Sequence, residues 1–241
     1  MEQNNLKPKS SVEEIQKRFD QDVERFSNLD TGQQTTIDAP LTLELTTSAA
    51  ATVTPAAVTM LDIGCGAGNY TLKMLEKIPG LDCTLIDLSM PMLQRAHERV
   101  SAVTTGNVEI LQADILVADL PENHYDIVLA AAVLHHLRAD SDWESVFNKI
   151  YRSLKPGGSF WISDLISHQP GELNQLFEAR YASYLEQLGG AEYRDKVLAY
   201  IDAEDSPRSV SYQLDLMKAA GFRYTDILHK NACFAAFGGI K

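Results

Sequence analysis

The chain has 241 residues, of which 45% are apolar and 22% are charged, a composition typical of a globular protein with room for one large domain. This composition excludes collagen-like, coiled-coil and wholly disordered chains. With 21 lysines and arginines against 33 aspartates and glutamates, the formal net charge is −12. Such a charge disfavours nucleic acid as a partner, because binding to nucleic acid relies on basic contacts to phosphate.

No segment predicts export or insertion into a membrane. No apolar run reaches the roughly 18–20 residues of a membrane-spanning helix, and the polar first dozen residues differ from a secretory signal. The three cysteines, Cys65, Cys83 and Cys233, are too few and too widely spaced for a disulfide framework or a C-x-x-C zinc motif. We therefore expect a cytoplasmic protein with buried cysteine side chains and no bound metal.

The first 56 residues are predicted to form a tail and a helical cap. Residues 1–11 are expected to be a flexible tail. Apolar residues at helical spacing from Ile15 to Phe26 predict an amphipathic helix, and the S-x-x-E pattern in front of it would cap its start. A loop with glycine and proline and a second helix at 41–51 complete the cap, which spans 12–56.

Short apolar runs and helical patterns alternate through the middle of the chain. Strands that alternate with helices, and that are apolar on both faces, predict a parallel sheet with helices on both sides. The expected strands lie at 58–63, 83–88, 108–111, 125–130 and 159–163. The expected helices lie at 70–77, 91–100 and 143–154. A Lys-Pro-Gly-Gly turn at 155–158 is expected to end the last helix and lead into the last strand.

The alternation of predicted strands and helices ends after the fifth strand. Residues 171–205 predict a long helical segment with an apolar stripe and no strand of its own, and a further helix is expected at 209–220. Two runs at 224–228 and 232–237, joined by a short connection at 229–231, predict an antiparallel hairpin. The predicted fold class is therefore α/β, with a mostly parallel seven-stranded sheet that ends in an antiparallel C-terminal hairpin.

The strongest motif, LDIGCGAGN at residues 61–69, follows the first predicted strand. Its glycines, Gly64, Gly66 and Gly68, remove side chains from the turn into the next helix, so a ligand can lie against bare backbone there. A dinucleotide-binding G-x-G-x-x-G would need a glycine at position 69, where this chain has Asn69. The motif has the form D-x-G-x-G-x-G instead.

With this motif the chain resembles the class I S-adenosylmethionine-dependent methyltransferases. Four further segments carry the resemblance, in order and at suitable intervals. They are Asp87 at the end of the second strand, QADI at 112–115, VLHHL at 133–137 and LKPGG at 154–158. The resemblance covers roughly residues 12–241 and implies a Rossmann-like three-layer sandwich.

The resemblance also implies a division of the chain. Residues 57–241 would form the methyltransferase domain, and residues 171–205 would be a helical lid inserted into it over the acceptor. The N-terminal helix, with Phe19, Phe26 and the Thr31-Gly32 pair, would close over the cofactor from the other side, although a plain surface cap is an equal alternative.

The resemblance implies that S-adenosyl-L-methionine is the cofactor. It also implies which residues would contact each part of the cofactor. Asp62 would reach the ammonium group, and Asp87 would accept hydrogen bonds from both ribose hydroxyls. Asp114 would accept from the adenine amino group while apolar neighbours pack on the ring. The predicted cofactor-binding residues are Asp62, Gly64, Gly66, Gly68, Asp87, Leu88, Asp114, Ile115 and Ala130.

Methyl transfer requires an oriented acceptor and, for a hydroxyl, amine or thiol, removal of its proton. His135 and His136, just beyond the fourth strand, and Asp164, at the end of the fifth, are the candidate catalytic residues. The alternative is that one histidine caps a helix, the other packs under the acceptor pocket, and Asp164 is a solvated loop carboxylate. Tyr181 and Tyr184 are candidate substrate contacts, with a core role as the alternative.

Three functions are compatible with these patterns. The leading one is an enzyme that transfers a methyl group by in-line displacement to a small-molecule acceptor. A second is a tRNA wobble-uridine-modifying enzyme, because the segments at 218–222 and 233–241 look like those of the carboxymethyl-transferring group. That group has an arginine in the preceding helix, and this chain has none between Ser211 and Gly221. The third is a non-catalytic S-adenosylmethionine-binding protein. A homodimer is left open.

Overall fold

The computed structural model describes residues 9–28 and 32–241 and contains a seven-stranded sheet in the order β3-β2-β1-β4-β5-β7-β6. The first five strands pair in parallel, and β7 pairs antiparallel with both β5 and β6. The strands are β1 (Thr59–Ile63), β2 (Asp82–Asp87), β3 (Val108–Gln112), β4 (Tyr125–Ala131), β5 (Leu154–Leu165), β6 (Tyr224–Asn231) and β7 (Phe234–Ile240). This sheet confirms the predicted fold class.

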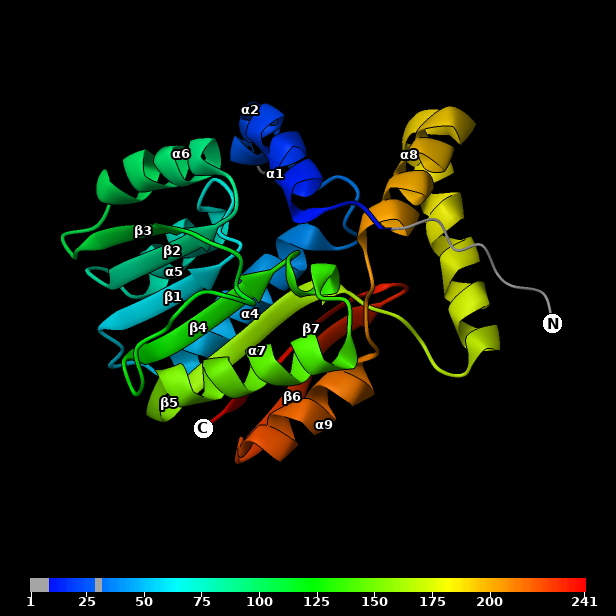
Figure 1. The fold of residues 1–241 in the computed structure, drawn as a ribbon. Coiled ribbons are helices and arrows are strands. Elements are labelled where there is room, and N and C mark those ends of the chain that lie inside the picture. Colours follow the sequence, from blue (N-terminus) through cyan, green and yellow to red (C-terminus); the bar gives the residue numbers. More distant parts are fainter. Residues whose placement is uncertain (1–8, 29–31) are drawn as a thin grey trace.

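Helices cover both faces of the sheet (Figure 1). One face carries α4, α5 and α6, and the other carries α7 and α9, while α8 stands beyond the end of the sheet. The helices are α1 (Val12–Gln21), α2 (Val23–Ser27), α4 (Ala39–Val53), α5 (Asn69–Lys77), α6 (Met90–Ser101), α7 (Asp140–Ser153), α8 (Gly171–Glu204) and α9 (Val210–Ala220), with a short 3-10 turn at Leu134–His136. In the part of the chain that the structure describes, no helix is both long and apolar enough to cross a membrane.

Alternation along the central strands produces two hydrophobic cores. In β1, Met60 is in the core under α4, α5 and α6, and the next residue, Leu61, is in the core under α7 and α9. Both side chains are fully buried, as expected for a strand with helices on both faces. The three cysteines are buried and free, as predicted.

Three details of the predicted strands are wrong. Lys155–Gly158 belongs to β5, because Leu154 pairs with Tyr125 across an irregularity in the register, and helix α7 ends at Ser153. The hairpin turns at Ala232 and Cys233, with φ of +47° at Ala232, so 229–231 continues β6. The third strand is at the sheet edge, so its apolar residues are largely exposed instead of buried on both faces.

The N-terminal region has two parts, one that packs in the sandwich and one that lies apart from the sheet. Ser11 caps α1 with Glu14 in the predicted capping box, while Lys9 and Ser10, which we assigned to the tail, bond to backbone at the end of α8. Residues 1–8 of the predicted tail lie outside the described residues. Helix α4 packs on α5 and β5 as part of the sandwich, so α1 and α2 are the part of the predicted cap that lies apart from the sheet.

Helix α8 matches the predicted 171–205 segment and bends at Gly190, where φ is +83°. Tyr181 and Leu185 are buried against β5 and β7. The apolar stripe predicted for this segment includes Leu173, Leu176 and Leu188. It is wrong in part, because these leucines are 43%, 54% and 42% exposed. The segment therefore uses only a narrow part of its apolar surface to dock on the sheet.

Candidate active site

The glycine loop that follows β1 has three residues in the left-handed conformation, at alternate positions. Gly64, Gly66 and Gly68 have φ of +65°, +51° and +83°, a region that L side chains avoid. A Cβ at Gly64 would lie 2.5 Å from Cγ2 of Val133, whereas a Cβ at Gly66 would meet nothing within 4 Å. Gly68 caps α5 and packs near Ala96 of α6. The loop therefore presents open backbone at Gly66.

Two acidic residues of β1 and β2 lie beside this loop, and Asp87 bonds to it directly. Asp87 accepts the N–H of Gly66 at 2.8 Å and that of Ser89 at 2.9 Å, and Asp62 accepts the hydroxyl of Thr71 at 2.6 Å. Burial raises the pKa of Asp87, and burial raises that of Asp62 to about 7. Both carboxylates are therefore held at the carboxyl ends of adjacent strands.

One cavity of about 890 Å³ runs along these strand ends. It joins the glycine loop to the end of β4, to α1 and α2, and to the second half of α8. Of the predicted site residues, it is lined by Asp62, Gly64, Gly66, Asp87, Leu88, Asp114, Ile115, His135, His136, Asp164 and Tyr181. The structure therefore brings these eleven residues to a single hollow.

Three predicted site residues are placed elsewhere. Ala130 points into the core on the α7 side, so Ala131 and Ala132 line the cavity in its place. Gly68 is behind the loop, against α6. Tyr184 faces a separate hollow of about 360 Å³ and donates its hydroxyl to the carbonyl of Gln34 at 2.8 Å.

Asp164 holds the segment after β4 in place. One of its oxygens accepts the backbone N–H groups of Leu134 at 2.9 Å and His135 at 3.2 Å, and the other pairs with Nδ1 of His135. Asp164 is 3% exposed, so it is not the solvated loop carboxylate of the alternative interpretation. Its bonds fix the ring orientation of His135 and leave Nε2 of that ring facing away from β5.

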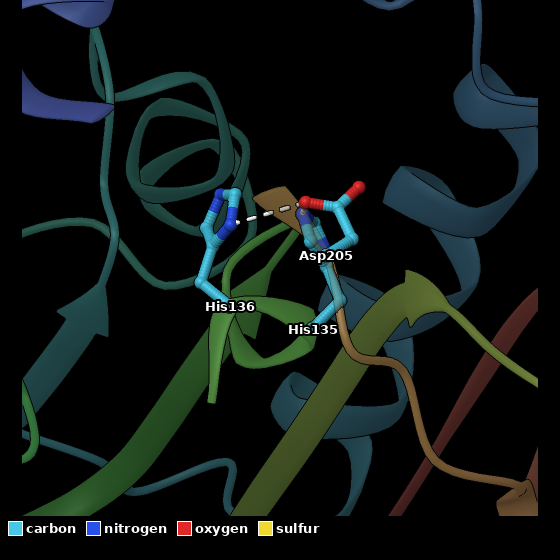
Figure 2. A group of neighbouring side chains, drawn as sticks. All are labelled: His135, His136 and Asp205. Carbon is cyan, nitrogen blue, oxygen red and sulfur yellow. Dashed lines mark ion pairs between the residues drawn. The ribbon is translucent and has the colours of Figure 1, made fainter. Parts of the chain in front are cut away.

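Asp205, directly after α8, lies opposite the two histidines (Figure 2). Its Oδ1 is 3.2 Å from Nδ1 of His136 and 3.7 Å from Nε2 of His135. The next residue, Ser206, donates its backbone N–H to the carbonyl of His135 at 2.7 Å, which ties the end of α8 to this segment. Sequence reasoning missed Asp205, because no motif or spacing connects it with a site on β4.

The charges of this group are strongly coupled. Burial alone would lower the pKa of His135, but attraction by Asp164 and Asp205 outweighs it and raises the pKa to about 9. Burial, together with repulsion by His135, lowers the pKa of His136. For Asp205, the nearby histidines outweigh the opposing effect of burial and lower the pKa.

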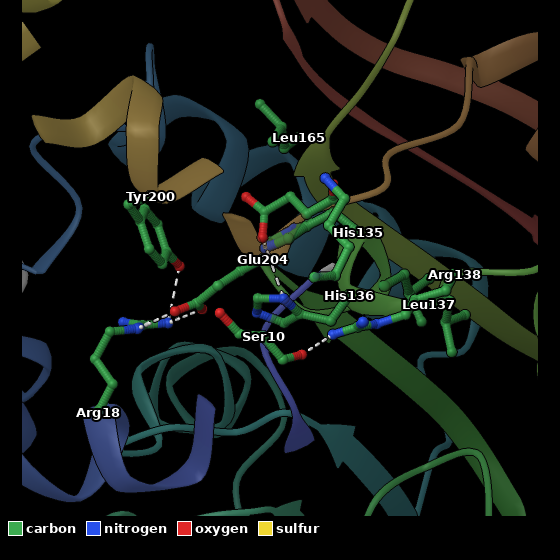
Figure 3. A network of polar contacts seen from close by, with 12 residues as sticks. Ser10, Arg18, His135, His136, Leu137, Arg138, Leu165, Tyr200 and Glu204 are labelled. Atoms are coloured by element: carbon green, nitrogen blue, oxygen red, sulfur yellow. Dashed lines mark hydrogen bonds and ion pairs between the residues drawn. The ribbon is translucent and has the colours of Figure 1, made fainter. Parts of the chain in front are cut away.

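Residues of α1 line the cavity beside this group, and Figure 3 shows Arg18 of α1 directed toward Tyr200 and Glu204. The guanidinium of Arg18 donates to Glu204 at 3.0 and 2.8 Å and to the hydroxyl of Tyr200 at 2.9 Å. On the other side, Arg138 donates to the carbonyl of Ser10. The Arg18 bonds connect α1 to the end of α8, and the Arg138 bond connects the segment after β4 to the residues in front of α1. Sequence reasoning did not single out either set.

Of the residues predicted to close over the cofactor from the N-terminal side, Phe19, Phe26 and Gly32 line the cavity. Thr31 lies outside the described residues. Phe19 makes an edge contact with the ring of His136. Residues of both N-terminal helices therefore line the cavity, and their closing over a cofactor stays a prediction.

The residues beside the glycine loop fit a nucleoside that carries an amino acid. Backbone is bare at Gly66, carboxylates stand at Asp62 and Asp87, and apolar side chains at Leu88 and Ile115 border the same hollow. Carboxylates can accept from ammonium and hydroxyl groups, and apolar side chains can cover an aromatic ring. S-adenosylmethionine presents each of these groups.

Comparison with known proteins points the same way. A family model described as "Methyltransferase domain" matches residues 60–158, which run from β1 to the start of β5. A demethylmenaquinone methyltransferase from Listeria welshimeri is 28% identical over 187 residues, covering 76% of this chain and 78% of the relative. A carboxy-S-adenosyl-L-methionine synthase from Shewanella woodyi is 26% identical over 184 residues, covering 75% and 74%.

Solved structures share the fold. Human N-acetylserotonin methyltransferase in complex with SAM has a TM-score of 0.62 at 17% identity, covering all of this chain and 60% of that one. PigF with SAH has a TM-score of 0.63 at 19% identity, covering 96% and 63%. Together with the matched domain and the relatives, the sheet and its glycine loop identify the chain as a class I S-adenosylmethionine-dependent methyltransferase.

Proposed function

We propose that this methyltransferase acts on a small-molecule acceptor. The observation that carries the proposal is the continuous cavity, which extends from the glycine loop past His135 and His136 to the lid helix α8. A volume of about 890 Å³ is near the upper end of the roughly 300–1,000 Å³ that small-molecule and cofactor pockets span. The cofactor and the acceptor would therefore share one enclosed space.

Aromatic side chains form the acceptor end of this space. Phe19 comes from α1 and contacts the ring of His136, and Tyr181, Tyr193 and Tyr200 come from α8. With α1 bound to α8 through Arg18, this end is roofed by protein, which suits a small apolar or aromatic molecule better than a folded RNA. The net charge of −12 also disfavours RNA.

In this proposal, α1, α2 and α8 act as the cap and lid that the resemblance implied. Bound S-adenosylmethionine supplies an electrophilic methyl group on a sulfonium. Asp62 and Asp87 orient the cofactor, and α8 excludes water from the acceptor. His135 and His136 contact and orient the nucleophilic atom of the acceptor, and Asp164 is the positioning residue for His135.

The relatives support a small acceptor. Demethylmenaquinone methyltransferase, by its name, acts on a small molecule, and the carboxy-S-adenosyl-L-methionine synthase is named for a small-molecule product. A homodimer and a cytoplasmic location stay predictions from the sequence.

Transfer of isotope-labelled methyl groups tests the proposal. The full chain is incubated with methyl-labelled S-adenosylmethionine and with separated small-molecule and RNA fractions. We expect label in the small-molecule fraction, and much less with the Asp87→Ala variant, which lacks the proposed cofactor contact. Label in RNA alone would overturn the proposal in favour of the wobble-uridine alternative. Cofactor binding without any labelled product would overturn it in favour of a non-catalytic binding protein.

A further inference from the structure

We propose that His135, His136 and Asp205 bind a divalent first-row transition-metal ion at the acceptor end of the cavity. One ligand atom from each residue lies within 4.8 Å of the other two, and all three residues line the cavity. The two histidines come from the turn after β4 and the aspartate from the end of α8, so the fold brings the three ligands together from two distant segments (Figure 2).

Buried polar atoms at this site lack hydrogen-bond partners in whole or in part. Nε2 of His136 is buried and has no partner within the described part of the chain, and Nδ1 of His136 and Oδ1 of Asp205 are buried with only each other and the ring of His135 as ion-pair partners there. Buried polar atoms are nearly always hydrogen-bonded, and exceptions indicate an ion or another missing partner. An ion coordinated by the Asp205 oxygen and by one ring nitrogen of His136 would satisfy atoms from both side chains.

His135 is prepared as a ligand by Asp164. The carboxylate pairs with Nδ1, which leaves Nε2 directed toward Asp205 at 3.7 Å. Metal-binding histidines commonly donate their second ring N–H to a carboxylate in this way, which fixes both the tautomer and the ring orientation. The arrangement therefore supplies a ligand and also the group that orients it.

The buried charge of this group is compatible with a bound dication. Asp164 and Asp205 are 3% and 5% exposed, and buried carboxylates require a compensating positive charge. The nearby guanidinium of Arg18 is already bound to Glu204 through two hydrogen bonds. An ion would take the place of the proton on His135, and a dication with two neutral imidazoles would balance both carboxylates.

The ligand types narrow the choice of ion. Two imidazole nitrogens and one carboxylate oxygen suit Zn²⁺, Fe²⁺ or Co²⁺, whereas Mg²⁺ and Ca²⁺ prefer oxygen ligands throughout. Three protein ligands leave at least one coordination position open toward the cavity. The inference departs from our expectation of no metal. With the ion bound, His135 and His136 would act on the acceptor through the ion instead of contacting it directly. The inference does not rest on the proposed acceptor, because an ion can bind without one.

Cobalt is a suitable probe because its visible absorption reports on coordination. Full-length, untagged protein is treated with chelator, dialysed, and titrated with Co²⁺ in the absence of cofactor and acceptor. We expect about one Co²⁺ per chain, displaced by Zn²⁺ but not by a large excess of Mg²⁺.

Variants assign the ligands. His136→Ala and Asp205→Asn should weaken Co²⁺ binding by at least about 100-fold, and Asp164→Asn by about 10–100-fold through His135. His97→Ala, which changes an exposed histidine of α6, is the matched control and should bind as the wild type does. Circular dichroism establishes that each variant is folded.

Absence of stoichiometric Co²⁺ binding by the wild-type chain overturns the proposal, whatever the variants do. Binding that is unchanged in folded His136→Ala and Asp205→Asn also overturns it, because the ion then lies elsewhere. Neither readout involves methyl transfer, so the metal site and the proposed acceptor class can fail independently.

Discussion

A methyl group added at Gly66 probes the contact between the glycine loop and the cofactor. Gly66 has φ of +51°, and a Cβ there would meet nothing within 4 Å, so Gly66→Ala adds one methyl group beside the cavity without a clash. The strain of alanine in a left-handed conformation should lower the free energy of unfolding by about 1–2 kcal/mol. In addition, the methyl group would separate a bound cofactor from the backbone.

Gly157→Ala is the matched control. Gly157 has φ of +81° and also nothing within 4 Å of a Cβ, but it is not among the residues that line the cavity. The two variants should lose similar stability in urea unfolding. In titration calorimetry, only Gly66→Ala should lose affinity for S-adenosylhomocysteine, by at least about tenfold or 1.4 kcal/mol. Equal, wild-type affinity in both variants would refute the contact at Gly66.

Buried charges give three further predictions. Asp87→Ala should weaken S-adenosylhomocysteine binding by about 1.5–3 kcal/mol in calorimetry, through lost hydrogen bonds to a charged group. Burial raises the pKa of Asp62 to about 7, and a ligand ammonium group favours the ionised carboxylate. Affinity should therefore rise about tenfold between pH 6 and pH 8, and Asp62→Asn should abolish the rise. Arg18→Ala leaves Glu204, whose side chain is 8% exposed, without its ion-pair partner, and should lower the free energy of urea unfolding by about 1–2 kcal/mol.

Each of these predictions has a contradicting outcome. Unchanged affinity in Asp87→Ala removes that residue from the cofactor site. A flat pH profile in the wild type contradicts an ammonium contact at Asp62, and Asp114→Asn serves as the control that should keep the pH dependence. Full additivity of Arg18→Ala with Glu204→Gln would show that the two side chains are not coupled.

Local patterns predicted most of the elements and one end of the candidate site. Strand and helix periodicity predicted the seven strands, and the glycine loop with Asp87 and Asp114 predicted where a ligand could lie, because each of these signals is confined to a few consecutive residues. The capping box at Ser11 is of the same kind. Such signals depend on backbone geometry and hydrogen bonds that act within one or two turns of chain.

Features that depend on which way a side chain faces were less predictable. Ala130 and Ala131 differ by one position in β4, and the alternation of the strand sends one to the core and the other to the cavity. Tyr181 and Tyr184 are three residues apart on α8, yet they face different hollows. In both cases the spacing alone leaves two faces to choose from, and tertiary packing decides.

Contacts between distant segments were not predictable from motifs. Asp205 meets His135 and His136 only because α8 returns to the end of β4 and Ser206 bonds to the His135 carbonyl. Likewise, Arg18 donates a hydrogen bond to Glu204, which lies 186 positions later in the chain. These pairings leave no spacing signal in a single sequence, although they shape the acceptor end of the cavity.

The account depends most on the claim that the glycine loop after β1 holds S-adenosylmethionine and its demethylated product. Titration calorimetry of the full chain with S-adenosylhomocysteine, and separately with NADH, tests this claim most directly. We predict saturable binding of one S-adenosylhomocysteine per chain and no heat of binding with NADH. Binding of NADH without binding of S-adenosylhomocysteine would contradict the claim.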